Sequence, residues 1–203
     1  KDVRTEKSIV KTEKLIVATG NAHKLKEIRE IFGGAEVISA YDEGYTGDPE
    51  ETGKTFEENA VIKAKAAADA LGLPALADDS GLCVDALSGA PGIYSARYAG
   101  GHGDDKANRA KLLENMRGVK NRNARFVCSV ALCFPDGKIV CAEGETSGKI
   151  LEEERGNGGF GYDPLFYSDD LKKGFGEASA EEKNSVSHRS RALEVLKKML
   201  AEM

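Results

Sequence analysis

Two adjacent carboxylates, Asp78 and Asp79, are the residues whose type and spacing most directly suggest chemistry. They follow an apolar run, residues 73–77, that is typical of a short buried strand, and Ser80-Gly81 is expected to turn the chain after them. Carboxylates at the carboxyl end of a buried strand lie where open α/β sheets bind ligands. Neighbouring acids repel each other unless a cation, a donor or a proton relieves them. The alternative is a solvated Asp-Asp-Ser-Gly turn, because these residue types are common in turns.

A second candidate site lies where an expected strand, residues 14–18, is followed by a turn and then by a helix that ends before Gly33. A helix N-terminus after a glycine turn presents several backbone N–H groups and a positive dipole end, which together favour an anion. Lys24 adds a full positive charge there. The alternative is an ordinary turn capped by Asn21. The candidate phosphate-binding residues are Thr19, Gly20, Asn21, Ala22, His23 and Lys24.

An acidic, turn-rich segment, residues 41–53, is expected to form a loop over the site. The capping box at residues 55–58 then opens a long helix. Glu50 and Glu51 are either solvated loop charges or candidate metal ligands. The second interpretation requires that the loop bring one of them close to Asp79.

A glycine-rich loop, residues 156–164, allows close approach of the backbone but contributes little to a core. If it exposes Phe160 and Tyr162, these rings form a stacking platform for a planar base. The alternative is a loop that is anchored by a core Phe. The candidate substrate-binding residues of this loop are Phe160, Gly161, Tyr162 and Asp163.

Three donors, Lys183, His188 and Arg189, are concentrated before the C-terminal helix. The helix dipole does not favour cations at that end, so an anionic or carbonyl-bearing ligand would offset the charge. The alternative is a solvated basic patch.

The remaining elements predict an α/β protein. Residues 125–134 alternate as in a half-buried strand, a Pro-Asp-Gly turn follows, and residues 139–145 return as the hairpin partner. This β-rich segment between helical ones favours a mixed sheet over a pure βαβ repeat. Residues 14–203 are expected to form a single domain, and residues 1–13 an extension outside it.

Composition limits the classes of function. With 40% hydrophobic and 31% charged residues, the 203-residue chain is typical of a folded globular protein. A net charge of −5 argues against binding a nucleic-acid polymer or an anionic membrane through bulk electrostatics. No apolar run approaches the roughly 20 residues that span a bilayer, and no signal peptide is visible. The four cysteines are interpreted as buried apolar residues in a reducing compartment, which indicates the cytoplasm.

Together, phosphate donors, metal-binding carboxylates (Asp79 with Glu50 or Glu51), an aromatic loop and a cluster of donors fit a purine nucleoside triphosphate bound with Mg²⁺. The chain closely resembles the inosine triphosphate pyrophosphatase family over residues 14–200. The motifs that carry this resemblance are TGNAHK (19–24), EETGKTFEENAVIKA (50–64), ADDSGL (77–82), GAPGIYSARYAG (89–100), GGFGYDP (158–164) and EKNSVSHR (182–189).

The resemblance implies two lobes around a long mixed sheet that is flanked by helices, with a nucleotide cleft between the lobes, and a homodimer. It also implies hydrolysis of deaminated purine nucleoside triphosphates (ITP, dITP, XTP, dXTP) to the monophosphate and pyrophosphate, with Mg²⁺ as cofactor, which removes them from the nucleotide pool. By motif match, Asp79 would be the general base and a metal ligand, and Ser80 would contact substrate. Either Glu50 or Glu51 would be the second metal ligand, and Asp78 would support Asp79.

Selectivity for the base follows from hydrogen bonding. Inosine and xanthine present a 6-oxo acceptor, whereas adenine presents a 6-amino donor. Donors from His188 and Arg189 that point at that oxygen would be left unpaired if adenine entered. Arg189→Ala is therefore expected to lose discrimination between bases, while the residue that excludes guanine is not identified.

Two other functions compete with this interpretation. A pyrophosphatase for modified pyrimidines would share the phosphate chemistry without the purine-reading cluster. A non-catalytic nucleotide sensor would bind the same ligand but would not need a base at Asp79. A Walker-type NTPase is disfavoured because no G-x-x-x-x-G-K-[ST] pattern occurs.

Overall fold

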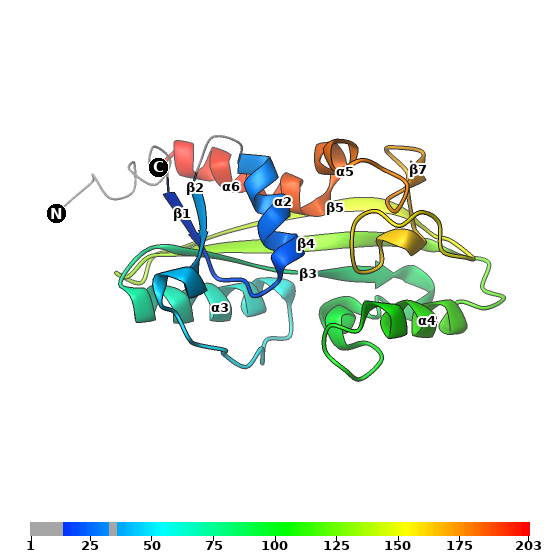
Figure 1. Cartoon of the computed structure of the whole chain (residues 1–203), viewed down its shortest axis with the longest axis horizontal. Helices are drawn as coiled ribbons and strands as arrows, with labels where there is room; N and C mark the ends of the chain where they lie inside the picture. The colour runs from blue at the N-terminus through cyan, green and yellow to red at the C-terminus, as the bar shows by residue number, and fades with distance from the viewer. Residues whose placement is uncertain (1–13, 33–35) are drawn as a thin grey trace. The chain divides into compact units, whose positions relative to one another are not determined.

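The structure is a computed structural model that describes residues 14–32 and 36–203 (Figure 1). The expected extension at residues 1–13 and the expected helix end at Gly33 lie outside the described residues. Within 14–32 and 36–203, no helix combines the length and the apolar character needed to cross a membrane.

The chain divides into two compact units. Unit 1 comprises the residues up to Asp79, together with Cys128–Gly144 and Arg189–Met203. Unit 2 comprises Ser80–Val127 and Glu145–His188. The expectation of a single domain with a cleft between two lobes stays a prediction, and each unit is described by itself below.

The strands form a seven-stranded sheet in the order β2-β1-β3-β4-β5-β6-β7. β1 pairs in parallel with β2 and with β3, whereas β5, β6 and β7 pair antiparallel. This mixed sheet with its helices confirms the predicted α/β class. The strands are β1 (Lys14–Val17), β2 (Glu36–Ser39), β3 (Ala75–Val84), β4 (Asn123–Cys133), β5 (Ile139–Ile150), β6 (Phe166–Ser168) and β7 (Lys173–Gly174).

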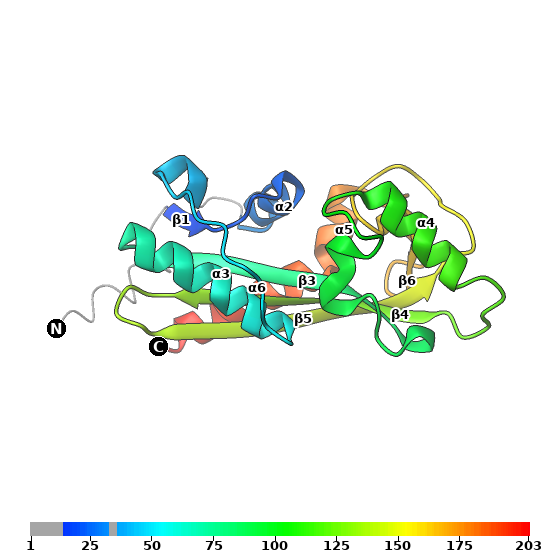
Figure 2. The ribbon, with the colours of Figure 1, turned by 90° about the horizontal axis from the view of Figure 1, so that it is seen from below.

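In unit 1, helices pack against both faces of the sheet (Figures 1 and 2). α2 (Ala22–Phe32) and α6 (His188–Ala201) share a core with one face, and α3 (Phe56–Leu71) shares a second core with the other. The side chains by which α3 contacts the sheet are small, which permits close packing. They are Ala60, Ala64, Ala67 and Ala68, all fully buried.

In unit 2, α4 (Asp105–Asn115) and the sheet enclose a core that contains Phe126, Phe166 and Phe175. α5 (Ala180–Val186) begins with a capping box, in which Ser179 and Glu182 satisfy each other's backbone N–H groups. Short 3₁₀ helices complete the chain: η1 (Ala40–Glu43), η2 (Asp85–Leu87), η3 (Gly92–Arg97) and η4 (Asp163–Leu165).

The strand that carries the two aspartates differs from the expectation. The predicted turn at Ser80-Gly81 is wrong, because β3 starts at Ala75 and continues through both residues to Val84. The apolar residues after Gly81 extend the buried strand, whereas Leu73 lies outside it and is 43% exposed. Neighbouring residues of a strand point to opposite faces, so Asp78 and Asp79 do not share one environment.

Three smaller expectations also need correction. β4 is buried on both faces from Phe126 onward and not half-buried, because helices cover both sides of the sheet. Lys183 lies in α5 rather than at the start of the C-terminal helix. The capping box at the start of α3 is half formed: Thr55 accepts from the backbone N–H of Glu58, while the Glu58 carboxylate accepts from Lys54.

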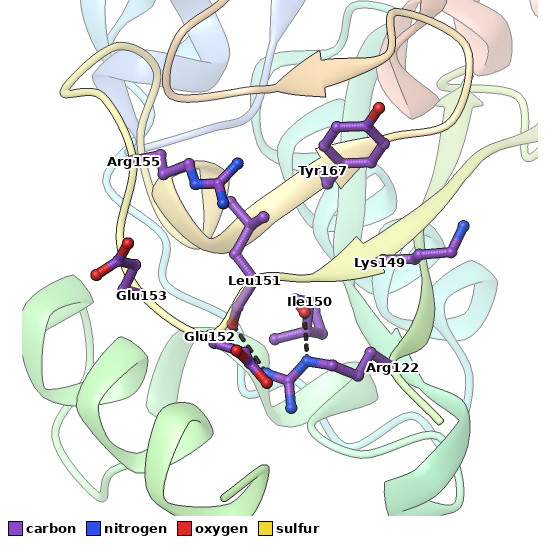
Figure 3. A pocket seen from close by; sticks show the side chains of 8 residues that line it. All are labelled: Arg122, Lys149, Ile150, Leu151, Glu152, Glu153, Arg155 and Tyr167. Carbon is purple, nitrogen blue, oxygen red and sulfur yellow. Dashed lines mark hydrogen bonds between the residues drawn. The ribbon is translucent and has the colours of Figure 1, made fainter. Parts of the chain in front are cut away.

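Arg122 joins two segments of unit 2. Its guanidinium donates to the backbone carbonyls of Ile150 at 2.6 Å and Leu151 at 2.9 Å (Figure 3). It also donates to those of Met116 at 2.9 Å and Val119 at 3.2 Å. The same side chain borders a hollow of about 510 Å³. None of the predicted site residues lines this hollow, so Arg122 is a structural residue.

Replacing Arg122 with Met should lower the free energy of unfolding by about 2–4 kcal/mol, because four carbonyls lose a charged donor. The matched control is Arg125→Met, since Arg125 is 48% exposed and its ion pair, with an exposed Glu145 at 3.4 Å, lies at the surface. Urea unfolding of both variants measures the difference. Equal losses in the two would contradict the role given to Arg122.

Candidate active site

The two aspartates lie just past the point where β1 ends. Val17, the last residue of β1, pairs with Leu76, and the backbone N–H of Ala18 donates to the Leu76 carbonyl at 2.7 Å. β3 continues beyond this point, while the β1 chain turns away through residues 19–24 into α2. The predicted phosphate turn and the aspartates therefore meet at the carboxyl end of a parallel strand pair in unit 1.

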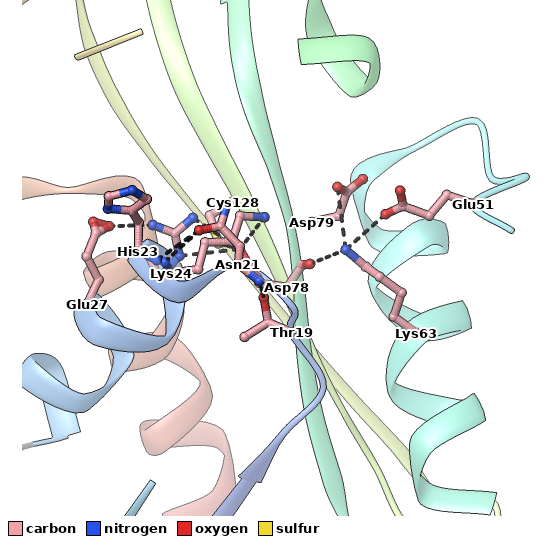
Figure 4. Close-up of polar contacts among 11 residues, drawn as sticks. Thr19, Asn21, His23, Lys24, Glu27, Glu51, Lys63, Asp78, Asp79 and Cys128 are labelled. Atoms are coloured by element: carbon pink, nitrogen blue, oxygen red, sulfur yellow. Dashed lines mark hydrogen bonds and ion pairs between the residues drawn. The ribbon is translucent and has the colours of Figure 1, made fainter. Parts of the chain in front are cut away.

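Asp78 is buried among cations, and its exposed fraction is 2%. One oxygen, Oδ2, lies 3.3 Å from Lys24 Nζ and 3.2 Å from Arg189 Nη2, and it also accepts from the Cys128 thiol at 3.8 Å (Figure 4). Burial by itself raises the pKa of Asp78, but the neighbouring Lys24 and Arg189 outweigh it and hold that pKa well below its usual range. The Asp78 carboxylate is thus ionised at neutral pH.

Arg189 joins three elements through ion pairs. Its guanidinium, 1% exposed, bonds Asp78 and also Glu27 Oε1, at 2.5 Å from Nη1. Glu27 was not predicted as a site residue. The sequence could have indicated Glu27, because it lies three residues after Lys24 within the apolar stripe of α2. An acidic residue on a buried helix face needs a charged or hydrogen-bonding partner.

The expected direct contact between Arg189 and a base stays a prediction. The guanidinium is held by two carboxylates of unit 1, which favours a role in positioning Asp78.

Asp79 faces a different group, on α3. Lys63 Nζ lies 3.9 Å from Asp79 Oδ1, 2.9 Å from Glu51 Oε1 and 2.6 Å from the Asp78 carbonyl (Figure 4). Lys63 was also missed, although it lies three residues after Ala60 on the face of α3 that packs on the sheet.

The pKa of the Asp79 carboxyl is shifted toward neutrality. Burial raises its pKa from the usual 3.8 to about 6, since the lowering effects of Lys63 and Lys24 are too small to offset burial and the nearby acids Glu51 and Asp78. Its Oδ2 atom is buried and has no hydrogen-bond partner among the described residues. An oxygen of this kind indicates a further ligand, either a water or a cation.

Glu51 and Asp79 are a suitable donor set for Mg²⁺. Of the two candidate glutamates, Glu51 reaches Lys63 beside Asp79, whereas Glu50 is exposed. Within the described part of the chain, no group of three His, Cys, Asp or Glu side chains is arranged to hold a metal. Mg²⁺ in phosphate-transfer sites commonly uses only one or two carboxylates and completes its shell with water and substrate phosphates.

The turn at residues 19–24 has the predicted cap. The Asn21 side chain accepts from the backbone N–H groups of His23 at 3.0 Å and Lys24 at 3.2 Å, and the Thr19 hydroxyl accepts from Asn21 N–H at 3.1 Å. Residues 20–23 are exposed. Phosphate binding at this turn stays a prediction.

The other predicted residues belong to unit 2 and cluster around a buried ion pair. Lys183 Nζ lies 2.6 Å from Asp163 Oδ2 and 4.6 Å from the centre of the half-buried Phe160 ring. The His188 imidazole, 5% exposed, stacks on Phe126 at 4.9 Å between ring centres. A buried cation, an aromatic ring and an imidazole are suited to a planar polar ligand.

Tyr162 does not belong to an exposed platform, contrary to expectation. It is 6% exposed, and its hydroxyl donates to the Ser95 carbonyl at 2.7 Å. The adjacent Gly161 is fixed as well, because its N–H donates to Asp105 at 3.0 Å and its carbonyl accepts from Arg109 at 2.9 Å. The loop is therefore anchored, as in the alternative interpretation, but by a Tyr. Ser80 also lies in unit 2 and is half-buried.

A sequence profile of the Ham1 family matches residues 15–199. The chain belongs to the Ham1 family. A dITP/XTP pyrophosphatase of Geobacter sulfurreducens is 52% identical over 188 residues, which are 91% of this chain and 94% of that protein. A dITP/XTP pyrophosphatase of Desulforamulus reducens is 53% identical and covers 89% of this chain and 92% of its own.

Solved Ham1 structures have the same fold. The Ham1 protein of Staphylococcus aureus is 43% identical and superposes with a TM-score of 0.83, over 93% of this chain and 98% of its own. The nucleoside-triphosphatase / dITP/XTP pyrophosphatase of Mycobacterium abscessus is 44% identical, with a TM-score of 0.73 over 90% of this chain and 98% of its own.

Because the two aspartates have opposite environments, replacing each with asparagine should change the free energy of unfolding in opposite directions. At about pH 8, Asp79→Asn should raise the free energy of unfolding by about 1–3 kcal/mol, because it removes a buried charge whose pKa is raised. Because the pKa of Asp79 is raised on folding, its protonated form stabilises the protein fully below pH 3.8, and this contribution is lost as the pH rises through about 6. The stabilisation caused by Asp79→Asn should therefore increase between pH 3.8 and about 6 and stay constant above that range. Chemical unfolding across this range measures it.

Asp78→Asn is the matched comparison and should destabilise by about 2–4 kcal/mol, because Lys24 and Arg189 lose a buried partner. Its lowered pKa gives the reverse sign: the stabilisation is present above 3.8 and is lost only as the pH falls through the lowered value. Stability changes of the same sign in both variants at about pH 8 would rule out this assignment.

Proposed function

We propose that this Ham1 protein hydrolyses deaminated purine nucleoside triphosphates, such as dITP and XTP, to the monophosphate and pyrophosphate. The observation that carries the reaction is the Asp79 carboxyl, which is buried, has a pKa raised to about 6, and lies beside Glu51 and Lys63. The substrate class is supported by the relatives named dITP/XTP pyrophosphatase, which are about half identical to this chain over nearly their whole length.

In the proposed reaction, Asp79 is the general base. Its pKa near 6 leaves it ionised at neutral pH and still able to accept a proton. The oxygen of a water molecule bonds to the α-phosphorus, the bond from that phosphorus to the bridging oxygen of the pyrophosphate group breaks, and the proton of the water passes to Asp79. Asp79 then returns the proton to solvent.

Positive charge must balance the triphosphate before a nucleophile can approach. We assign Glu51 and Asp79 to hold Mg²⁺, which when bound neutralises phosphate oxygens and orients the water. Lys63 and Lys24 supply two further positive charges in unit 1. The turn from Thr19 to Lys24 is proposed to receive the phosphates at the N-terminus of α2, where the helix dipole favours an anion.

Recognition of the base is assigned to residues of unit 2. Phe160 supplies a ring face, and Lys183, which is fixed by Asp163, and His188 supply polar contacts. Ser80, Gly161 and Tyr162 are proposed to contribute by shaping the region in which the substrate binds. A donor from His188 to the 6-oxo group would be left facing an amino group if adenine entered. Arg189 is proposed to act indirectly, through Asp78.

Two further features belong to this proposal. A homodimer is expected from the family resemblance, and light scattering of the purified chain tests it. A cytoplasmic location agrees with the absence of disulfides among the described cysteines, which is typical of a reducing compartment.

The decisive test is a product assay with dITP, XTP, dATP and dGTP in the presence of Mg²⁺, read by ³¹P NMR. Monophosphate and pyrophosphate from dITP and XTP, with little from dATP and dGTP, are expected. Release of orthophosphate would mean that a different bond is cleaved. Tight binding of dITP without turnover would favour the nucleotide sensor, and preference for a modified pyrimidine would favour the related pyrophosphatase.

Two variants separate base reading from positioning. His188→Ala should reduce the preference for dITP over dATP by roughly 10–100-fold, because it removes the donor to the 6-oxo group. Arg189→Ala should instead lower kcat/KM for both nucleotides alike, since it releases Asp78. Steady-state kinetics on both substrates measures the ratio. A collapsed ratio in Arg189→Ala together with an unchanged ratio in His188→Ala would reverse the two roles.

A further inference from the structure

Lys63 lies between the two carboxylates that the proposed function assigns to a divalent cation. Its Nζ bonds Glu51 Oε1 at 2.9 Å, lies 3.9 Å from Asp79 Oδ1, and donates to the Asp78 carbonyl at 2.6 Å (Figure 4). An ammonium and a divalent cation held by Glu51 and Asp79 would compete for the same two carboxylates.

The surroundings explain why these carboxylates need a cation when both are ionised. The Lys63, Glu51 and Asp79 side chains are only 22%, 26% and 11% exposed, so none of the three charges is well solvated. Leaving two partly buried carboxylates uncompensated would be costly. Lys63 supplies one positive charge against two negative ones.

A second observation indicates that the arrangement is incomplete. The Oδ2 atom of Asp79 is buried and has no hydrogen-bond partner among the described residues, while Oδ1 faces Lys63. The backbone contact to Asp78 offers Lys63 a fixed point that does not involve either carboxylate. The ammonium can therefore give up Glu51 and Asp79 without leaving the site.

We propose that Lys63 is a displaceable counter-ion. It holds Glu51 and Asp79 in position in the metal-free protein, and it yields them to the divalent cation that arrives with the phosphate chain, whose negative charge then pairs with the ammonium. This inference rests on the proposed use of a divalent cation. A divalent cation alone must displace the Lys63 ammonium and therefore binds weakly. When the cation and the phosphates bind together, the carboxylates pair with the cation and the ammonium pairs with the phosphates. Binding of the two ligands is therefore positively coupled.

Binding of Mn²⁺ alone to the full chain, without nucleotide, tests this competition. Free Mn²⁺ is followed by electron paramagnetic resonance. Lys63→Met should bind Mn²⁺ roughly tenfold or more tightly than the wild type, because no ammonium has to be displaced. Lys63→Gln, which keeps a polar group near the Asp78 carbonyl, provides a second variant in case the first folds poorly. Circular dichroism verifies the fold of each.

Two control variants separate displacement from a general change in charge. Lys65→Met removes an exposed ammonium from the same helix, whose partner is Asp69 at 2.8 Å, and should leave both Mn²⁺ binding and turnover unchanged. Lys24→Met removes a positive charge that pairs with Asp78 at 3.3 Å and not with Glu51 or Asp79. It should tighten Mn²⁺ binding far less than Lys63→Met does.

Mn²⁺ binding by the folded Lys63 variants that is no tighter than in the wild type would overturn the proposal, as would equal tightening in Lys24→Met. The assay also distinguishes this inference from the proposed function. If the wild type produces pyrophosphate but the Lys63 variants bind Mn²⁺ no more tightly, only the counter-ion role fails. If the variants bind more tightly but the wild type produces no pyrophosphate, only the proposed reaction fails.

Discussion

The burial of one carboxylate, Asp78, sets the arrangement of unit 1. An ionised group with 2% exposure is tolerated only when charged donors surround it. Those donors come from two different helices, Lys24 from α2 and Arg189 from α6, and Glu27 completes the balance by taking the other side of Arg189. The charge requirement of Asp78 therefore ties two helices to the central strand, and it does so next to the predicted phosphate turn.

Adjacency on a strand gives the two aspartates different chemistry. The Asp78 carboxylate contacts Lys24 and Arg189 and stays ionised. Asp79 points to the other side of β3, where burial outweighs the effects of Lys63 and Lys24 on its pKa. Two titratable groups whose environments move their pKa values apart are typical of sites in which one residue anchors and the other reacts. The strand itself produces this division, because successive side chains alternate between faces. A turn at Ser80-Gly81 would not have enforced it.

The features that could be predicted from the sequence depend on local patterns. The parallel strand, the turn and α2, the alanine face of α3 and the β4–β5 hairpin each follow from periodicity or turn chemistry within about 20 residues. The ion pairs of Arg189 with Glu27 and Asp78 could not be located in this way, because these partners lie 162 and 111 positions away in the chain. Lys63 lies close in sequence to its partners, but a helical pattern alone does not say which carboxylates its side chain meets. Tyr162 was placed wrongly for the same reason: its hydrogen bond to Ser95 spans 67 positions, and nothing near it in sequence indicates burial.

Burying an ionised Asp79 lowers the free energy of unfolding. The protein offsets this loss by placing different numbers of cations on the two sides of β3. Surrounding Asp79 with as many cations as Asp78 would lower its pKa and remove its capacity to accept a proton near neutrality. Contact with Lys63 and a weaker effect of Lys24 are a compromise, since these charges limit the penalty of burial while the pKa of Asp79 stays near 6. The neighbouring Asp78, through its ion pairs with Lys24 and Arg189, stabilises the fold, which the proposed general base Asp79 does not do when it is ionised. Because both residues belong to one rigid strand, the stable member also fixes the position of the reactive one.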